Sequence, residues 1–445
     1  MEKAMGAASR GGALSVDKAY SHSHALRGFI EVVQPMFNAA EALKMVIASL
    51  FLFWTLYHVP LIIAGLRRFF EEADGSDDGV GRSPLHRPKV SIIVPVKNEE
   101  KVVGRLLEAL VNLTYPNKEV IVVEDGSTDR TGEICKRFAE KYPSVIKYCH
   151  RDVGEGKPSA INFAAKKATG EIMAIYDADA VVEPDLLERI LPHFEDPEVA
   201  AVQGQEYAVN QKQSLWTKLA ALNDFLIHIA QLGRDELELF VVCKGNHMYF
   251  RRSVLEELGF WDPQALAEDA EVSVRLMKRG YRVKYVTVRV GIEAPPKLRS
   301  LIRQRLRWFR GYLQVLGKHK DLLSPSSVRR LDALMALLTP VFLALSLPGF
   351  VIGLWFIASF TGQVLGFALL FVGVLGPNAL ALALTKPRNF VYIPLLYLNW
   401  VVMASIAAYA CFHALLRKRM EWTKTEKHGV VTEVDFSIVS REKAP

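Results

Sequence analysis

Two long stretches of this sequence contain no charged residue, and they restrict what the chain can fold into. Met45–Leu66 and Ala333–Thr385 lack Asp, Glu, Lys and Arg altogether. A helix of about 20 apolar residues crosses the roughly 30 Å hydrocarbon core of a bilayer. The first stretch fits one such helix, whereas the second predicts two with a break near Ser359–Gln363. A further apolar stretch, Phe390–Leu416, predicts another span.

The basic residues beside these stretches indicate their orientation. Arg67 and Arg68 follow the first stretch, and the run 417–419 (Arg-Lys-Arg) ends the last. Because basic residues favour the cytoplasmic side, both ends are predicted to be cytoplasmic, in a multi-pass protein of the cell membrane. One span before the central region and three after it would instead put the tail outside. Either one proline-containing segment is re-entrant or the span count is wrong, and we give the charge bias more weight.

The composition supports a chain with both soluble and membrane parts. Mean hydropathy is +0.14, although 23% of residues are charged, as in a soluble domain. The predicted organisation is an N-terminal arm (1–42), a transmembrane helix (43–68), a linker (69–87), a cytoplasmic domain with interfacial helices (88–322), about three transmembrane segments (323–416) and a basic, cytoplasmic tail (417–445).

The central region alternates short β-branched runs with helical stretches. The expected strands are 90–94, 119–123, 144–148 and 171–176, and the expected helices are 101–112, 130–141 and 159–167. Uninterrupted apolar strands that alternate with helices predict an α/β fold, in which a parallel sheet is covered on both faces. Ligands of such sheets bind at the carboxyl ends of the strands.

Acidic residues follow three of the four expected strands. Glu99 comes after the first strand, Asp125 after the second, and Asp177 and Asp179 after the fourth. Carboxylates that converge on one sheet edge repel each other unless a cation joins them, and Mg²⁺ or Mn²⁺ prefers such oxygen ligands. Ordinary turn chemistry explains any one of these positions equally well. It explains all three together poorly, so we predict a metal site.

Other phosphate- and nucleotide-binding classes do not fit the sequence. Gly156-Lys157 resembles part of a P-loop, but the first glycine of that motif is replaced by Arg151 and its Ser or Thr by Pro158. No GxGxxG follows the first strand, which excludes a dinucleotide fold. Lys157 is either a point charge for a phosphate or a solvated loop lysine. The net charge of +7 suits an anionic membrane surface or a phosphorylated substrate and is too diffuse for nucleic acid.

Several motifs together resemble the membrane-integrated family 2 glycosyltransferases, which include the cellulose, chitin and hyaluronan synthases. The matching segments are PVKNE (95–99), EDGSTD (124–129), GKPSAIN (156–162), DAD (177–179), CKGNHMYFRR (243–252), EDAEVSVRL (268–276) and QRLRW (304–308). The resemblance implies a GT-A-type fold and an inverting transfer from a nucleotide-diphosphate sugar. It differs at Glu124, where the family often has Asp, and in the loop 244–246.

The resemblance also implies roles for individual residues. Asp179, with Asp177 nearby, would hold the metal that stabilises the leaving diphosphate. The nucleotide sugar would be bound by Pro95, Glu99 and Asp125, together with Asp177 and the loop lysine Lys157.

The motif Glu268-Asp269 matches the family's general base and the acidic residue beside it. The resemblance implies that Asp269 takes the proton of the acceptor hydroxyl, with Glu268 on the acceptor side. An alternative is that the two carboxylates cap the helix that follows them, and both functions can hold together.

The motif QxxRW places Gln304, Arg307 and Trp308 on one helical face, because they are spaced i, i+3 and i+4. An indole that stacks on sugar and a guanidinium that binds phosphate suit an acceptor and diphosphate site. The alternative is an interfacial amphipathic helix with Trp and Arg at the headgroups. Further on, 422–427 (WTKTEK) resembles the family's gating loop, although a plain basic tail explains it more simply.

These features predict a membrane-bound glycosyltransferase that uses Mg²⁺ or Mn²⁺. It would transfer a hexose or N-acetylhexosamine from a nucleotide-diphosphate sugar to a growing polysaccharide. The alternative acceptor is a lipid, either a polyprenyl phosphate or a diacylglycerol, which the small number of spans favours. A membrane scaffold with an inactive transferase domain would have lost the DxD motif or the base, and both are present.

Overall fold

The computed structural model describes most of the central region and parts of the flanking apolar segments. The described residues are 46, 49, 53–54, 56–72, 87–152, 154–359, 379, 382, 391–416, 425 and 427–432. The predicted arm 1–42 lies outside the described residues, and so does most of the span predicted between the Ser359–Gln363 break and Thr385.

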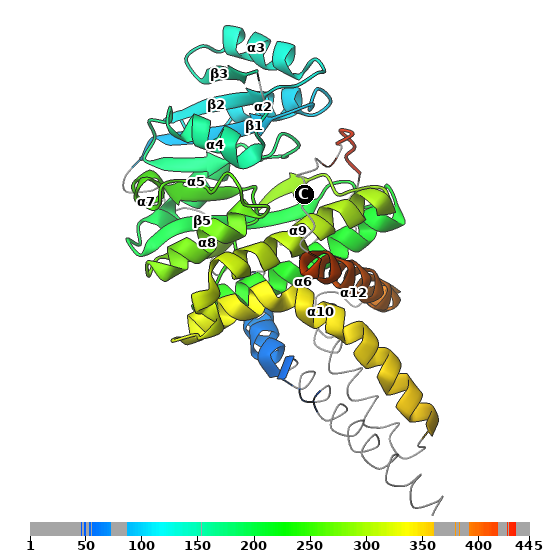
Figure 1. Cartoon of the computed structure of the whole chain (residues 1–445). Coiled ribbons are helices and arrows are strands. Elements are labelled where there is room, and N and C mark those ends of the chain that lie inside the picture. The colour runs from blue at the N-terminus through cyan, green and yellow to red at the C-terminus, as the bar shows by residue number, and fades with distance from the viewer. Residues whose placement is uncertain are drawn as a thin grey trace, which may run out of the picture.

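One seven-stranded sheet organises the central region (Figure 1). Its strands are β1 (Val90–Val96), β2 (Lys118–Asp125), β3 (Ile146–Arg151), β4 (Ile172–Ile175), β5 (Val199–Ala208), β6 (Met248–Arg251) and β7 (Arg282–Ile292). They are arranged in the order β3-β2-β1-β4-β6-β5-β7. β6 runs antiparallel to both of its neighbours, and every other pairing is parallel. The predicted α/β class is therefore confirmed, with one antiparallel strand that the sequence did not indicate.

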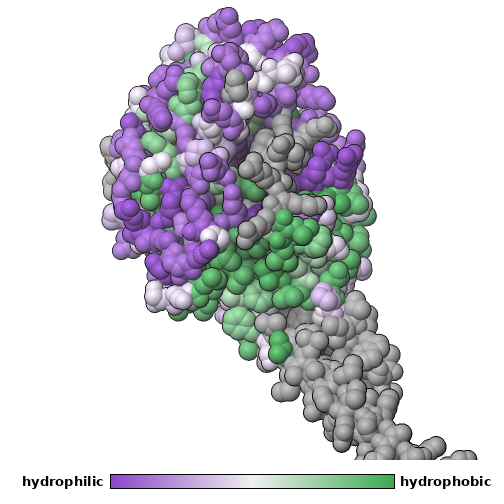
Figure 2. Space-filling model, viewed as in Figure 1, coloured by the Kyte–Doolittle hydropathy of each residue, from purple (hydrophilic) through white to green (hydrophobic). Residues whose placement is uncertain are grey.

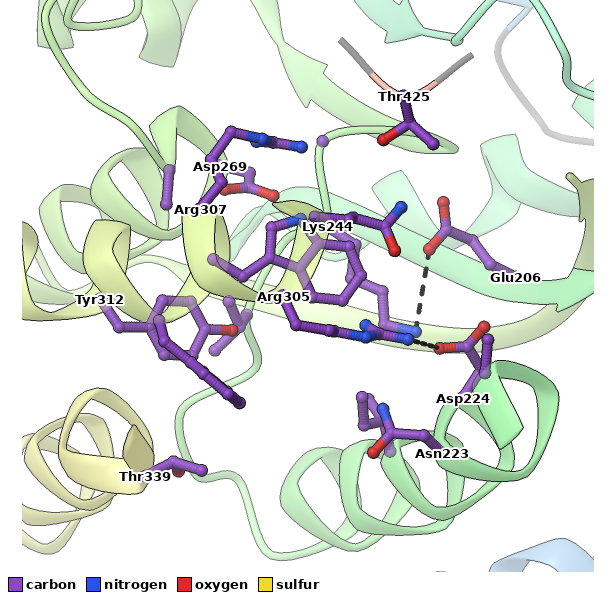
Figure 3. Close-up of a pocket in the computed structure, with 18 of the residues that line it drawn as sticks. Glu206, Asn223, Asp224, Lys244, Asp269, Arg305, Arg307, Tyr312, Thr339 and Thr425 are labelled. Carbon is purple, nitrogen blue, oxygen red and sulfur yellow. Dashed lines mark hydrogen bonds and ion pairs between the residues drawn. The ribbon is translucent and has the colours of Figure 1, made fainter. Parts of the chain in front are cut away.

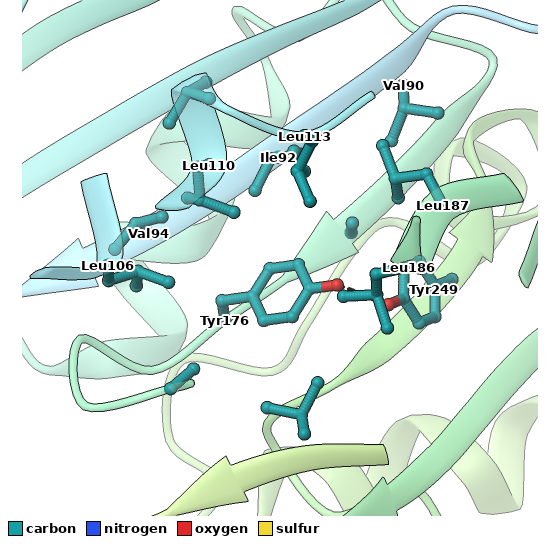
Figure 4. Packing of buried hydrophobic residues seen from close by; sticks show 14 of the residues in the cluster. Val90, Ile92, Val94, Leu106, Leu110, Leu113, Tyr176, Leu186, Leu187 and Tyr249 are labelled. Carbon is teal, nitrogen blue, oxygen red and sulfur yellow. Dashed lines mark hydrogen bonds between the residues drawn. The ribbon is translucent and has the colours of Figure 1, made fainter. Parts of the chain in front are cut away.

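The strands are apolar on both faces because helices cover both faces of the sheet. Val90, Ile92 and Val94 of β1 pack into one core cluster, whereas the intervening Ile93 packs into another on the opposite face. Figure 4 shows the first cluster, in which the hydroxyls of Tyr176 and Tyr249 are hydrogen-bonded to each other.

The helices of the sheet domain divide between these two clusters. α2 (Val103–Val111), α3 (Thr131–Lys141), α5 (Leu186–Ile190) and the short helix η1 (Leu191–Phe194) contribute side chains to the first cluster. α4 (Lys157–Ala165), α7 (Arg252–Leu258) and α8 (Glu268–Lys278) contribute to the second. The sheet edge where β1, β2 and β4 end is thereby left to loops.

Below the sheet, α6 (Leu215–Glu236) and α9 (Leu298–Lys318) pack against two apolar helices, α10 (Val328–Ser359) and α12 (Ile393–Leu415). A short turn, η2 (Lys320–Leu323), leads from α9 towards α10. The helix that contains residues 56–72 lies directly on α6. A Cβ atom on Gly65 would be 2.0 Å from the carbonyl oxygen of Ile229, and one on Gly233 would be 1.9 Å from that of Leu61. The two glycines therefore allow the helix backbones to touch.

Apolar surface gathers on this lower helical part. Figure 2 shows hydrophilic side chains over the sheet domain and a hydrophobic band below them. Exposed members of the helical part include Phe53, Ile63, Val328, Val401 and Phe412. Within the described residues, Val328–Gly349 and Ile393–Leu415 are long and apolar enough to cross a membrane.

Candidate active site

The strand ends that carry the acidic motifs meet at one edge of the sheet. β1 is paired with β2 on one side and with β4 on the other, so the chain order reverses beside β1. The turns after β1 and β2 are tied together, because the Asn98 side chain accepts a hydrogen bond from the Thr128 amide at 2.7 Å. Asn98 has φ +52°, a conformation that Asn tolerates better than most residues.

Asp125 ends β2 and is buried against basic and amide groups. One carboxylate oxygen lies 3.3 Å from Arg151 Nε, and the other accepts a hydrogen bond from the Gly156 amide at 3.1 Å. Burial raises the pKa of Asp125, although Arg151 opposes this shift. Lys97 also lies close to this carboxylate, so a polar ligand would meet both charges here.

Lys157 joins the strand-end carboxylates to the predicted base. Its ammonium lies 2.5 Å from Asp177, 4.0 Å from Glu268 and 2.7 Å from the carbonyl oxygen of Gly245. A Cβ atom on Gly245 would be 3.2 Å from an oxygen of Asp269, which shows how closely the loop passes. Gly245 also has φ +80°, so glycine meets both the steric and the backbone requirement here.

Asp269 lies in the first turn of α8, beside Glu268. The N-cap of the helix is Ala267, so neither carboxylate is the capping residue, but both lie in the first turn and Asp269 Oδ1 accepts a hydrogen bond from the Ala270 amide at 2.8 Å. Burial, followed by the charge of Glu268, raises the pKa of Asp269 to about 7, while Lys157 and Arg307 lower it. A carboxylate with such a pKa suits the acceptance of a proton near neutral pH.

We expect activity to follow the ionisation of Asp269. If this carboxylate is the base, kcat/KM rises as pH increases through about 7, because only the ionised form can take a proton. A pH–rate profile of hexose transfer measures this rise, and an Asp269→Glu variant with residual activity should show a displaced midpoint. A profile that is flat between pH 5.5 and 8.5 would contradict the assignment.

The QxxRW residues lie on α9 and face the same region. Gln304, Arg307 and Trp308 all line one cavity, as their shared spacing predicts. Arg305, which lies between them in sequence, is only 2% exposed and also lines the cavity. Its guanidinium stacks on the Trp308 ring with 4.1 Å to the ring centre.

The tail segment 427–432 closes over Asp179. The Lys427 ammonium lies 2.7 Å from Asp179, whose carboxylate also accepts a hydrogen bond from the Glu293 amide at 2.7 Å. Burial raises the pKa of Asp179, but the charge and hydrogen bond of Lys427 outweigh this and lower it overall. The Glu293 carboxylate in turn accepts hydrogen bonds from the amides of His428, Gly429 and Val430.

The Glu293 carboxylate is expected to hold this tail segment in place. Glu293→Ala removes the acceptor of three backbone amides, and hydrogen bonds to charged groups contribute about 1.5–3 kcal/mol each. Amide exchange in 427–432 should therefore accelerate by at least roughly tenfold, as measured by hydrogen–deuterium exchange. Glu198→Ala, on the exposed turn before β5, is the control. Unchanged exchange would show that other contacts hold the tail.

One cavity of about 1170 Å³ connects the sheet edge, the first turn of α8 and α9. Every residue that the sequence predicted for the site lines it: Pro95, Glu99, Asp125, Lys157, Asp177, Asp179, Glu268, Asp269, Gln304, Arg307 and Trp308. The cavity continues downward between the helices, where Trp54, Phe342 and Leu396 belong to its wall. The structure thus brings the predicted site residues together in one cavity, whereas the chemical roles of these residues stay predictions.

The predicted metal site offers two carboxylates. No group of three or more His, Cys, Asp or Glu side chains is placed to hold a metal ion within the part of the chain that the structure describes. Asp177 is partly open to the cavity with its side chain 39% exposed, whereas Asp179 is covered by Lys427. Two hard oxygen donors fit Mg²⁺ or Mn²⁺ when substrate phosphates and water complete the coordination.

Comparison with known proteins agrees with this fold and indicates its family. Residues 91–259 match the model of the family described as glycosyl transferase family 2. The beta-monoglucosyldiacylglycerol synthase of Nostoc sp. is 30% identical over 397 residues, which cover 84% of this chain and 82% of that protein. The poly-beta-1,6-N-acetyl-D-glucosamine synthase of Staphylococcus epidermidis is 29% identical over 231 residues, 51% of this chain and 55% of that protein.

Among solved structures, the mannosyltransferase PcManGT from Pyrobaculum calidifontis, in complex with GDP-Man and Mn²⁺, has a TM-score of 0.59 to this chain. It is 25% identical, and the match covers 84% of this chain and all of that one. The fold, the site and these matches define a glycosyltransferase with a GT-A-like fold. The chain belongs to glycosyl transferase family 2.

The sequence did not point to several residues of the cavity wall. Glu206 on β5, Asp224 on α6 and Glu293 after β7 belong to no recognised motif, yet all three line the cavity. Lys244 and Arg305 lie inside motifs that resemble the glycosyltransferase family, but the resemblance implied no role for either residue. A charged residue within a mainly apolar element could have indicated these positions, because charged residues are rarely buried unless they are paired.

Proposed function

We propose that this protein transfers one hexose or N-acetylhexosamine, with inversion, from a nucleotide-diphosphate sugar to a membrane lipid. The observation that carries the proposal is the cavity itself. It extends from the predicted base Asp269 to a wall of apolar side chains on the helices below the sheet. A lipid whose head reaches Asp269 while its chains remain among those helices fits this shape.

The donor would bind at the sheet edge. Glu99 and Asp125, which line the cavity, would accept hydrogen bonds from the nucleoside, and Pro95 would shape the wall beside them. Lys157 and Arg307 are cations whose charges act on Asp269, where the diphosphate would leave. Asp177 and Asp179 would hold Mg²⁺ or Mn²⁺, which when bound supplies positive charge to the diphosphate.

The transfer itself is a single displacement. The acceptor oxygen forms a bond to the anomeric carbon while the bond from that carbon to the diphosphate oxygen breaks. The acceptor proton passes to the Asp269 carboxylate, and the nucleoside diphosphate departs with the electron pair. Burial of Asp269 and the adjacent Glu268 favours proton uptake, because both raise the pKa of this carboxyl group.

A lipid acceptor is favoured over the polysaccharide that the sequence ranked first. The lower cavity wall is built from side chains such as Leu343, Leu396 and Met403, which suit acyl or prenyl chains. The match to the lipid-modifying Nostoc synthase covers most of both chains, whereas the match to the Staphylococcus polysaccharide synthase covers about half. A growing polysaccharide is the second candidate, supported by Trp54, Trp308 and Trp400 in the wall, since aromatic rings stack on sugars.

Membrane attachment belongs to the same proposal. This proposal is supported by two apolar helices, by the exposed hydrophobic band beside them and by the basic residues that flank the apolar segments. Together they favour a multi-pass protein with a cytoplasmic catalytic domain. Membrane fractionation followed by protease treatment of sealed vesicles tests this. A catalytic domain that is protected inside right-side-out spheroplasts and cleaved in inverted vesicles is the expected result.

The transfer is tested with the full chain in membranes that contain Mn²⁺. A panel of UDP-glucose, UDP-N-acetylglucosamine and GDP-mannose is offered together with diacylglycerol or a polyprenyl phosphate. The expected product, identified by mass spectrometry, is one lipid that has gained the mass of a single sugar. A ladder of many sugars would instead support polysaccharide synthesis. No incorporation from any donor by folded protein would contradict both.

A further inference from the structure

A second polar cluster lies in the cavity, apart from the carboxylates of the sheet edge. It consists of Glu206 on β5, Asp224 on α6, Lys244 in the loop before β6 and Arg305 on α9. Lys244 Nζ is 3.9 Å from Glu206, and Arg305 Nη2 is 3.4 Å from Asp224. Figure 3 shows the two pairs side by side, with Asn223 next to Asp224. We call these four residues the four-charge cluster.

The cluster is buried but incompletely hydrogen-bonded. Glu206 and Asp224 are each 9% exposed, and Arg305 is 2% exposed. Charge-assisted hydrogen bonds are usually about 2.7–2.9 Å long, so both ion pairs are loose. Among the residues that the structure describes, Arg305 Nε and Nη1 have no hydrogen-bond partner, and neither has Oε1 of the adjacent Gln304. Buried polar atoms without partners in the wall of a cavity indicate that a polar ligand completes the site.

The loop 244–246 connects this cluster to the reaction centre. The Asn246 side chain accepts a hydrogen bond from the Asp177 amide at 2.9 Å and donates one to Glu206 at 2.9 Å. Gly245, one residue earlier, is the position next to Asp269 and Lys157. A ligand bound between Lys244 and Glu206 would therefore contact the same loop whose next residue, Gly245, lies beside the predicted base Asp269.

The chemistry of the cluster selects the kind of ligand. When Glu206 is ionised, the two cations and two carboxylates sum to no net charge, which offers little attraction to a phosphate. Hydroxyl groups, in contrast, both donate and accept hydrogen bonds, so they can pair with carboxylate and guanidinium at once. Burial raises the pKa of Glu206 to about 7, with Lys244 opposing, so this carboxyl can also change its hydrogen-bonding role near neutral pH.

We propose that the four-charge cluster binds the uncharged, hydroxyl-bearing head of the acceptor and thereby selects it over a phosphorylated lipid. The inference rests on the proposed transfer to a lipid and adds the class of head group. Trp308, whose ring stacks against the Arg305 guanidinium, forms the cavity wall beside the cluster. The cluster residues position the acceptor, and the proton transfer remains with Asp269.

The experiment compares two acceptors and two isosteric variants of the full chain. Initial rates are measured in mixed micelles at saturating donor, with dioleoylglycerol or with a polyprenyl monophosphate. The unmodified protein should prefer dioleoylglycerol. Glu206→Gln and Asp224→Asn should each raise the KM for dioleoylglycerol at least roughly tenfold while the donor KM stays unchanged. At a pH above 7, where Glu206 is ionised, each should also use the phosphorylated lipid relatively better, because the cluster loses a negative charge.

The control variant is Glu236→Gln, an exposed position on the same helix as Asp224, which should alter neither KM. Binding of radiolabelled dioleoylglycerol to the detergent-solubilised protein gives a second readout that does not depend on transfer. Melting temperatures show whether each variant is folded. A further variant, Arg305→Lys, keeps the positive charge but loses the planar guanidinium, so it should also weaken lipid binding.

Three results would overturn the inference. They are a preference of the unmodified protein for the phosphorylated lipid, an equal effect of the variants on donor and acceptor KM, and unchanged dioleoylglycerol binding in all folded variants. Failure of the proposed function looks different. In that case dioleoylglycerol binds and the variants weaken its binding, but no sugar is transferred from any donor.

Discussion

Asp269→Asn is expected to lower kcat by about 100- to 10,000-fold while donor affinity changes little, because an amide of the same shape cannot accept the acceptor proton. Rapid-mixing or end-point assays of sugar transfer measure the loss, and titration with the nucleoside diphosphate measures the binding. The variant should melt at the same or a higher temperature, since burial and Glu268 disfavour the charge that it removes.

The matched control is Asp262→Asn, which changes a carboxylate in the loop just before α8. Asp262 contacts Lys318 at 2.9 Å and is not part of the cavity wall, so this variant should keep its activity. If Asp269→Asn retained more than about a tenth of the activity, the proton would have to go elsewhere. Glu268 would then be the next candidate, because it shares the same turn of the helix.

Asp179→Asn is expected to lower kcat/KM by about 100- to 1,000-fold, since charge stabilisation of a leaving diphosphate is typically of this size. It should also weaken nucleoside diphosphate binding in the presence of Mn²⁺ and leave binding in its absence nearly unchanged. Calorimetric titration with and without Mn²⁺ separates these two effects.

The ion pair between Asp179 and Lys427 requires a second variant. Lys427→Gln removes the cation but keeps both carboxylates, so it should bind the Mn²⁺–nucleotide complex at least as well as the unmodified protein. If Lys427→Gln reproduced the whole defect of Asp179→Asn, Asp179 would act by holding the tail and not by holding a metal.

The strand ends were predictable from sequence because they depend on local patterns. An apolar run of β-branched residues followed by Asp, Asn or Gly identifies where β1, β2 and β4 finish, and parallel pairing then brings those ends together. The predicted strands differ from the observed ones by a few residues, most at β3, which begins at Ile146 and continues to Arg151. Strands β5, β6 and β7 were not predicted, because polar residues such as Gln203, Arg251 and Arg289 interrupt their apolar patterns.

The roles of neighbouring charges were not predictable, because they depend on packing between distant elements. Asp179 looked like an open metal ligand, but the structure covers it with a lysine 248 positions later in the chain. Arg305 occupies one of the unspecified positions of QxxRW, and the structure buries it against Asp224 on another helix. No local pattern records which helix will lie across from a given side chain.

The first four strands with the helices between them, the acidic strand ends and the shared face of QxxRW were thus determined by the sequence, since each follows from the pattern of a single element. The tertiary structure alone decided that β5, α6, α9 and the loop before β6 meet around four charges beside the base. Such a meeting depends on the approach of surfaces far apart in the chain, which is set by packing and by close contacts such as that of Gly65 with Ile229.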